Sequence, residues 1–337
     1  MNWRQDFQNS VRPVDNAFVQ TAVAAAKRGE RQGRLDIAAS LAWAAYACPD
    51  ATYEVYDVLA SAWLGRGPTS DIPSDKASAP LEESFWEAYW AVIDGAEEGY
   101  DATTITVAVA SLGGAVHEDF AVLAETLACR HPGADQAQQK QVPGLTDIEG
   151  LAQCPTGSLG RELYDLLTAN GYDPEVLDRN EIMLNALPPA LRYLNTRILQ
   201  MHDVWHLVAG YETTGSQEIA ISSFQLAQFP HNYSSMFLAA VSMISHIQAP
   251  QGFNILMQII CEAWQHGRQT PVMMAIEWEE EWNTPMEEVR EKYGISTLRT
   301  VFPADLMETM GEGSFWAKLK LGWQLARFNR RVRAEAA

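Results

Sequence analysis

The sequence is short of cysteines, long apolar runs and strand-forming patterns, and each shortage narrows the class of protein. The four cysteines lie far apart and form no CxxC pair, which argues against a thiolate metal motif or a disulfide framework. No stretch approaches the roughly 18 apolar residues of a membrane span, since the best candidate, 236–244, contains Ser242. The polar start shows no signal-peptide core. We therefore expect a reducing, cytoplasmic compartment and at most peripheral membrane contact.

Positive charge is also scarce, except at one end of the chain. The 337 residues include 24 Lys and Arg against 43 Asp and Glu, a net charge of −19. Such an acidic surface repels phosphate backbones, so we expect no nucleic-acid partner. Residues 314–337 are the exception, with six basic residues against one acid. Aromatic and apolar residues alternate with these cations, which suits a helix on an anionic membrane surface. A C-terminal helix packed on the acidic body of its own chain is an equally weighted alternative.

Helical periodicity dominates the rest of the sequence, so the predicted fold class is all-α. The polar stretch 131–142 is predicted to separate a helical N-terminal domain of unknown role, 1–135, from a second helical domain, 143–300. A basic amphipathic segment, 301–337, follows. The stretch 105–112 is compatible with helix or strand. Helices are expected at 18–26, 35–47, 53–64, 81–93, 116–129, 160–170, 190–210, 216–229, 236–247, 254–266 and 285–293.

One segment of the second domain carries a metal-ligand pattern. His202 and His206 are four residues apart and share one helix face, so both imidazoles can reach a single ion. Gly210 predicts the helix end, and a returning helix would bring Glu218, in its first turn, beside His206. Two imidazoles and a carboxylate suit one divalent ion, zinc or iron. Asp203 is a candidate fourth ligand, a group orienting a ligand, or a catalytic base.

Each of these residues also has an ordinary structural explanation. A His-x-x-x-His pair alone is more often surface or core, and Glu218 would also favour a helix N-terminus through the macrodipole. Asp203 could be a solvated helix carboxylate. The sequences at 117–119 and 266–268 fit a helix start and a helix end. For the acidic run 277–282, the charged face of an amphipathic helix and a functional site are about equally supported.

Taken together, the motifs resemble the coenzyme Q (ubiquinone) biosynthesis proteins of the Coq-four type. The HDxxH sequence of His202, Asp203 and His206, followed after eleven residues by Glu218, matches the signature of that family. The resemblance covers roughly 144–295 and leaves the first 135 or so residues without a family. Further matching positions are the turn 155–161, Phe224, Gln228, Trp264, Gly267, Arg268, Trp278, Glu279, Val289, Arg290, Gly294 and Ile295.

The resemblance implies an all-α fold, a bound divalent metal usually described as zinc, and a place in ubiquinone biosynthesis. It also implies a metal-dependent oxidative decarboxylation that replaces the C1 carboxyl of a polyprenylated hydroxybenzoate-type precursor with a hydroxyl, formally a lyase step. The chain departs from the family just before the HD, where it has Leu199 and Gln200 and keeps only Arg197 of an expected charged set. Candidate substrate-binding residues are then Arg197, Phe224, Gln228, Phe237 and Arg268, with Phe237 in an apolar helix that either lines a polyprenyl channel or is plain core.

The alternative function is a non-catalytic lipid-binding scaffold that organises ubiquinone-biosynthesis enzymes at the membrane. A metallopeptidase fits poorly, because HDxxH puts a shorter aspartate where the usual glutamate base stands. The expected partners are the polyprenylated quinone precursor, other ubiquinone-biosynthesis proteins and, peripherally, the cytoplasmic face of the inner membrane. Contact with a second copy of the chain stays open.

Overall fold

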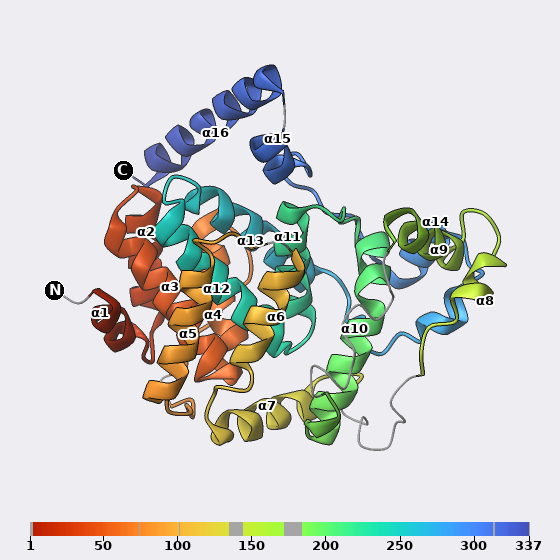
Figure 1. Ribbon diagram of the computed structural model, residues 1–337, viewed down its shortest axis with the longest axis horizontal. Coiled ribbons are helices and arrows are strands. Elements are labelled where there is room, and N and C mark those ends of the chain that lie inside the picture. The colour runs from red at the N-terminus through yellow and green to blue at the C-terminus, as the bar shows by residue number, and fades with distance from the viewer. Residues whose placement is uncertain are drawn as a thin grey trace. The chain divides into compact units, whose positions relative to one another are not determined.

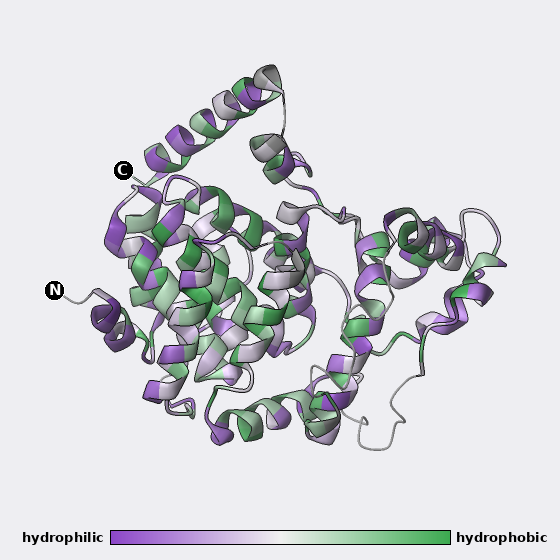
Figure 2. Cartoon of the chain, in the orientation of Figure 1, coloured by the Kyte–Doolittle hydropathy of each residue, from purple (hydrophilic) through white to green (hydrophobic). Residues whose placement is uncertain are grey.

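The computed structural model describes residues 3–73, 75–100, 102–134, 144–171, 184–312 and 314–336. Within these ranges every regular element is a helix, and the one β-bridge, between Ser158 and Pro285, is isolated (Figure 1). The prediction of an all-α fold is confirmed. The stretch 105–112 lies in helix α6, Ala102–Leu112. Hydrophobic and hydrophilic residues alternate along most of the helices, as amphipathic packing requires (Figure 2).

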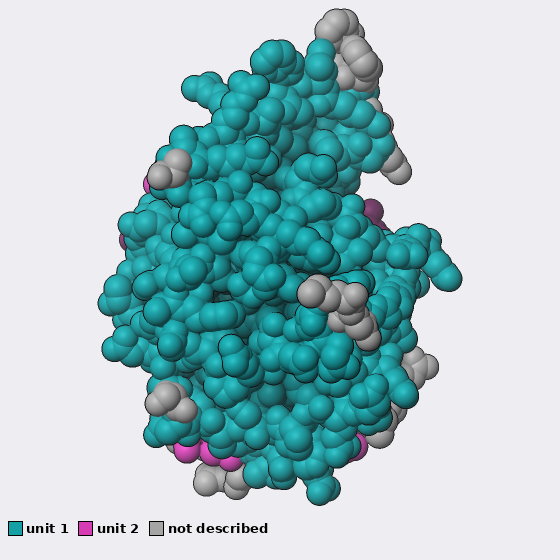
Figure 3. Space-filling view, turned by 90° about the vertical axis from the view of Figure 1, so that its left-hand side faces the viewer, with its two compact units in different colours: residues 1–124, 214–267, 300–337 teal, residues 125–213, 268–299 magenta. Residues whose placement is uncertain are grey.

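The chain forms two compact units that do not follow the order of the sequence. Unit 1 combines 1–124, 214–267 and 300–337, and unit 2 combines 125–213 and 268–299 (Figure 3). Residues 214–267, inside the predicted second domain, therefore pack with the N-terminal helices. Of the predicted boundary 131–142, residues 135–142 lie outside the described residues. The predicted domain limits stay predictions from sequence.

Unit 1 is built around long helices that approach each other closely. Helix α3 packs against α2 and α12, and nearly all of its second half is buried. Small side chains allow this: a Cβ atom at Gly33 would lie only 2.3 Å from the backbone nitrogen of Ala26. The helices with residues in unit 1 are α1 (Trp3–Ser10), α2 (Asn16–Lys27), α3 (Arg31–Tyr46), η1 (Pro49–Ala51), α4 (Thr52–Leu64), α5 (Glu83–Gly95), α6, α7 (Glu118–Arg130), α11 (Gly215–Gln228), α12 (Asn232–Gln248), α13 (Phe253–Gln269), α15 (Leu306–Glu312) and α16 (Phe315–Glu335).

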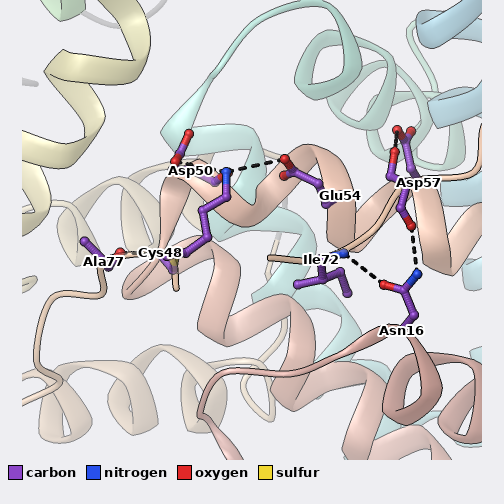
Figure 4. A network of polar contacts seen from close by, with 9 residues as sticks. Asn16, Cys48, Asp50, Glu54, Asp57, Ile72 and Ala77 are labelled. Carbon is purple, nitrogen blue, oxygen red and sulfur yellow. Dashed lines mark hydrogen bonds and ion pairs between the residues drawn. The ribbon is translucent and has the colours of Figure 1, made fainter. Parts of the chain in front are cut away.

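Polar contacts fix the loop after α4 onto this unit (Figure 4). Lys76 makes ion pairs with Asp50 at 2.9 Å and Glu54 at 3.4 Å. The buried carboxylate of Asp57 accepts hydrogen bonds from Ser70 in the loop and from the indole of Trp264 in α13, both at 2.8 Å. Side-chain contacts therefore hold the described residues of the predicted loop 69–80 against residues 50–57 of η1 and α4.

Unit 2 brings together two segments of the predicted second domain that lie far apart in the sequence. The first residues of α9 pair with the segment before α14: Leu159 N donates to Thr284 O, and Gly160 N to Trp282 O, both at 2.9 Å. A Cβ atom at Gly160 would lie 2.9 Å from Trp282 O, so only glycine permits this approach. The helices of unit 2, besides the ends of α7 and α13, are α8 (Ile148–Ala152), α9 (Leu159–Asn170), η2 (Leu184–Ala186), α10 (Pro189–Ala209), η3 (Trp278–Glu281) and α14 (Met286–Tyr293).

None of the described helices is both long and apolar enough to span a bilayer.

Candidate metal centre

Helix α10 carries the predicted ligand pair and stops where the sequence predicts. It starts with Pro189 in its first turn, where a missing N–H costs nothing, and runs to Ala209. Gly210 follows with a left-handed φ of 72°. A Cβ atom there would lie 2.8 Å from Cβ of Thr297, so both the backbone conformation and the space require glycine. The helix end is thus fixed four residues beyond His206.

The two histidines face each other. Nε2 of His202 lies 3.0 Å from Nε2 of His206, and the ring centroids are 4.6 Å apart at an interplanar angle of 78°. Two imidazole nitrogens on one tetrahedral zinc ion, each about 2.05 Å from the metal, would be about 3.3 Å apart. The observed spacing is close to that value, so the pair fits one shared ion with little movement.

Asp203 completes a cluster of three potential ligands. One ligand atom from each of His202, Asp203 and His206 lies within 4.8 Å of the other two, and no other group of at least three His, Cys, Asp or Glu was found among the described residues. His206 is buried, whereas His202 and Asp203 are half-buried. The cluster therefore has one protected side and one side open to approach.

The backbone after the helix orients His206. Its Nδ1 atom lies 3.1 Å from the carbonyl oxygen of Tyr211. A carbonyl can only accept, so Nδ1 carries the hydrogen and, in the neutral ring, the lone pair is on Nε2, which faces His202. Metal-binding histidines in proteins are commonly held in this way. The donor set and its support fit a divalent ion.

Arg290 fixes the end of α10 that carries His206. Its guanidinium donates to the carbonyl oxygens of Leu207, at 2.8 Å, and Val208, at 3.0 Å, while Leu298 N donates to Ala209 O at 2.8 Å. Carbonyls in the last turn of a helix have no regular intrahelical partners, and here, among the described residues, only Leu207 O has a further backbone donor, Gly210 N at 3.3 Å. In the sequence, Arg290 stands out only as a position that matches the family motif. No local pattern predicts its contact with a helix that lies 82 to 83 residues earlier.

Glu218 lies in the first turn of α11, as predicted. The turn is anchored within unit 1, because Thr214 and Ser216 donate to Ala304 O at 2.6 and 2.7 Å. The histidines belong to unit 2. The role of Glu218 as a third ligand stays a prediction.

Arg197 and the acidic run form ion pairs in unit 2 in which one partner is buried and the other is about half exposed. Arg197 is 3% exposed and binds Glu279 through both of its terminal nitrogens, one of them at 2.8 Å. Partial burial acts to raise the pKa of Glu279, but the guanidinium outweighs it and the pKa is lowered. Glu281, also buried, binds Lys292 at 2.6 Å. Much of the run is the short 3₁₀ helix η3, and these contacts account for two of its carboxylates structurally.

The other predicted substrate residues lie elsewhere. Phe224 and Gln228 are buried where α11 crosses α13: the Phe224 ring lies 5.0 Å from that of His266, and Gln228 donates to Gly267 O at 2.6 Å. Helix packing accounts for both residues. Phe237 is buried in α12 with its ring stacked on Tyr233, and Arg268 is exposed. Their substrate roles stay predictions.

His117 fits its structural explanation, since its Nδ1 accepts a hydrogen bond from Asp119 N at 3.2 Å at the start of α7.

Comparison with known proteins finds relatives for part of this helical chain. Residues 134–299 match the family model described as coenzyme Q (ubiquinone) biosynthesis protein Coq4. The mitochondrial ubiquinone biosynthesis protein COQ4 homolog of Rattus norvegicus is 28% identical over 194 residues, covering 53% of this chain and 71% of the relative. The Homo sapiens homolog is 26% identical over 185 residues, covering 53% and 67%.

A crystal structure from Nostoc punctiforme, named as a candidate ubiquinone biosynthesis protein, has a similar fold. Its TM-score is 0.50 at 26% identity, covering 63% of this chain and 97% of that one. The class is thus an all-α protein with a histidine–carboxylate cluster. Through residues 134–299 the chain belongs to the Coq4 family. Residues 1–133 lie outside the matched segment.

Proposed function

We propose that this chain acts in ubiquinone biosynthesis and binds the aromatic head of a polyprenylated hydroxybenzoate-type precursor at the His202–Asp203–His206 cluster. The observation that carries the proposal is the cluster itself, on the HDxxH helix of a Coq4-family domain. The names of the relatives support the pathway. The proposed partners are the prenylated precursor and other proteins of the same pathway.

His202, His206 and Glu218 would hold the divalent ion, with Asp203 as a further ligand or a base. When bound, the ion supplies a Lewis acid and a template for the carboxylate and phenolic oxygens of the ring. The contact of His206 Nδ1 with Tyr211 O leaves the Nε2 lone pair facing His202. Arg290 holds the helix end that carries His206. The Asp203 carboxylate, on the accessible side, accepts the proton of the ring hydroxyl.

We further propose that the reaction replaces the C1 carboxyl with a hydroxyl. The carboxyl carbon leaves as carbon dioxide, and one atom of dioxygen becomes the ring hydroxyl. The other oxygen atom leaves as water, so the step also consumes two protons and two electrons from an external reductant. Zinc has no redox chemistry, whereas ferrous iron held by two histidines and a carboxylate is a known setting for dioxygen. The proposed catalytic ion is therefore iron, and zinc would favour binding without turnover.

The test is turnover by the pure 337-residue chain, loaded separately with zinc or ferrous iron, on a short-tailed prenyl hydroxybenzoate with ascorbate as the two-electron reductant. Mass spectrometry would follow loss of the carboxyl and, under labelled dioxygen, gain of one heavy oxygen. The expected result is product with iron, absent in His206→Ala and retained in His117→Ala. Metal-dependent binding of the substrate without product in any sample would overturn the catalytic proposal and favour the scaffold.

A further inference from the structure

Helix α16 has two apolar faces, and only one of them packs on its own chain. Its 21 residues, Phe315–Glu335, follow the N-cap residue Ser314, whose hydroxyl accepts a hydrogen bond from Ala317 N. One face is buried, with residues spaced four, three and four apart as a helix stripe requires. This inner face consists of Leu321, Leu325, Phe328 and Val332.

The inner face anchors α16 within unit 1. The ring of Phe328 packs edge-on against Phe302, with centroids 4.9 Å apart. Near the C-terminus, Nη2 of Arg333 would lie 3.4 Å from a Cβ atom at Gly29, between α2 and α3. One side of α16 therefore packs on its own chain, as the alternative in the sequence analysis expected. It does not account for the opposite side.

The outer face combines exposed apolar side chains with unpaired cations. Leu319 is 43% exposed and Trp323 is 70% exposed. At 100° per residue, their four-residue spacing continues to Arg327, and Arg330 falls on the same side, about 180° from the inner face. Both arginines and the neighbouring Lys320 are exposed and make no ion pair within the described part of the chain. Figure 2 shows both hydrophobic and hydrophilic residues along this helix.

This arrangement is unusual for a protein whose net charge is −19. Unpaired cations around a protruding tryptophan match a surface that offers negative charge at its boundary and an apolar layer beneath it. An anionic lipid bilayer has both properties, whereas a nucleic acid would meet the repulsion of the acidic body. We infer that the outer face of α16, defined by Leu319, Lys320, Trp323, Arg327 and Arg330, docks the protein on anionic membranes.

The inference stands on α16 alone, outside the 134–299 Coq4 match, and does not rest on the proposed enzymatic function. Docking through one face of a helix whose other face is packed gives a fixed orientation, so unit 1 would present one defined side to the lipid. The inner face stays packed in the docked state.

The experiment is co-sedimentation of the full chain with phosphatidylcholine vesicles, with and without about 30% phosphatidylserine, at low and high salt. We expect binding only to the anionic vesicles, weakened by salt. The double variant Leu319→Ser/Trp323→Ser should lower the vesicle partition coefficient at least tenfold, since it removes the apolar insertion. Arg327→Gln and Arg330→Gln should each lower it roughly fivefold. The matched control, Arg12→Gln/Arg66→Gln, changes two exposed arginines elsewhere in unit 1 and should have no effect.

All variants leave the inner face intact and should keep the wild-type helical content and melting temperature, which circular dichroism checks. Absence of binding to anionic vesicles, or binding that the outer-face variants do not change, would overturn the inference. Sedimentation velocity and a nucleic-acid shift assay test whether a second copy of the chain or a nucleic acid binds the outer face instead. A dimer or nucleic-acid complex that the same variants abolish, without vesicle binding, would also overturn the inference.

Discussion

His202 and His206 approach each other through their Nε2 atoms, 3.0 Å apart, while Nδ1 of His206 lies 3.1 Å from Tyr211 O. The contact with Tyr211 determines which atom His206 presents to His202. It fixes which nitrogen of His206 carries the hydrogen, and so leaves the other as a ligand atom. We therefore expect the geometry at the helix end to affect metal binding, although none of residues 207–211 belongs to the predicted ligand set.

Gly210→Ala should disturb this turn more than a glycine substitution of the same backbone type elsewhere. Gly210 and Gly171 both end helices of unit 2 with left-handed φ values, 72° and 65°. Among the residues that the structure describes, a Cβ atom at Gly171 meets nothing within 4 Å, whereas at Gly210 it collides with Thr297. We expect a loss of unfolding free energy of about 1 kcal/mol for Gly171→Ala and about 2–4 kcal/mol for Gly210→Ala. Urea denaturation measures both, and equal losses would contradict the packing argument.

Arg290→Gln should weaken the end of α10 from outside the cluster. It removes two charge-assisted hydrogen bonds to the Leu207 and Val208 carbonyls, and we expect a loss of about 1–3 kcal/mol of stability with weaker metal binding. Glu287→Gln is the control, since Glu287 pairs with the same guanidinium but is largely exposed. That variant should stay within about 0.5 kcal/mol of wild type. Unchanged metal affinity in Arg290→Gln would show that the turn does not position His206.

Asp203→Asn separates the two roles given to that residue. The amide keeps the shape but loses the negative charge and the ability to take up a proton. If Asp203 is the base, the variant keeps its metal and loses turnover by at least about 100-fold. If it is a ligand, metal content falls as well. Full turnover with full metal content would remove Asp203 from the mechanism.

His246 predicts an acid sensitivity in unit 1. Burial, and then the nearby guanidinium groups of Arg34 and Arg31, lower its pKa to about 4 from an ordinary value of 6.5. The folded state thus keeps it neutral while the unfolded chain takes up a proton, so stability is full above pH 6.5 and falls as the pH drops towards 4. His246→Gln should remove this dependence, on the order of 2 kcal/mol across that window. Urea melts of both proteins at pH 7 and pH 4.5 measure it, and parallel losses would contradict the assignment.

The sequence predicted the parts of the fold that local patterns determine. Period-3.6 patterning predicted the all-α class, and the glycine at 210 predicted the end of α10, because a left-handed residue there has a purely local signature. Helix geometry alone predicted that the two histidines of the His-x-x-x-His pair share one face. Each of these depends on residues within a few turns of one another.

Local sequence patterns could not predict the contacts between segments that are far apart in the chain. Nothing near Arg290 indicates that it holds the end of α10, and nothing near Arg197 indicates a partner at Glu279. Nothing near Phe224 and Gln228 indicates that they pack where α11 crosses α13 at Gly267, and their substrate-binding role stays a prediction. In α16 the composition could not show that one face is buried and the other open, because burial depends on what the helix packs against.

The most direct test of the metal centre is elemental mass spectrometry of the chain purified without an affinity metal, beside His206→Ala and the control His117→Ala. The account predicts about one zinc or iron per chain in the wild type and in His117→Ala, and roughly none in His206→Ala, with unchanged helical content in all three. Metal retained at full stoichiometry in His206→Ala, or absent from the wild type, would contradict the assignment of the cluster as a metal centre.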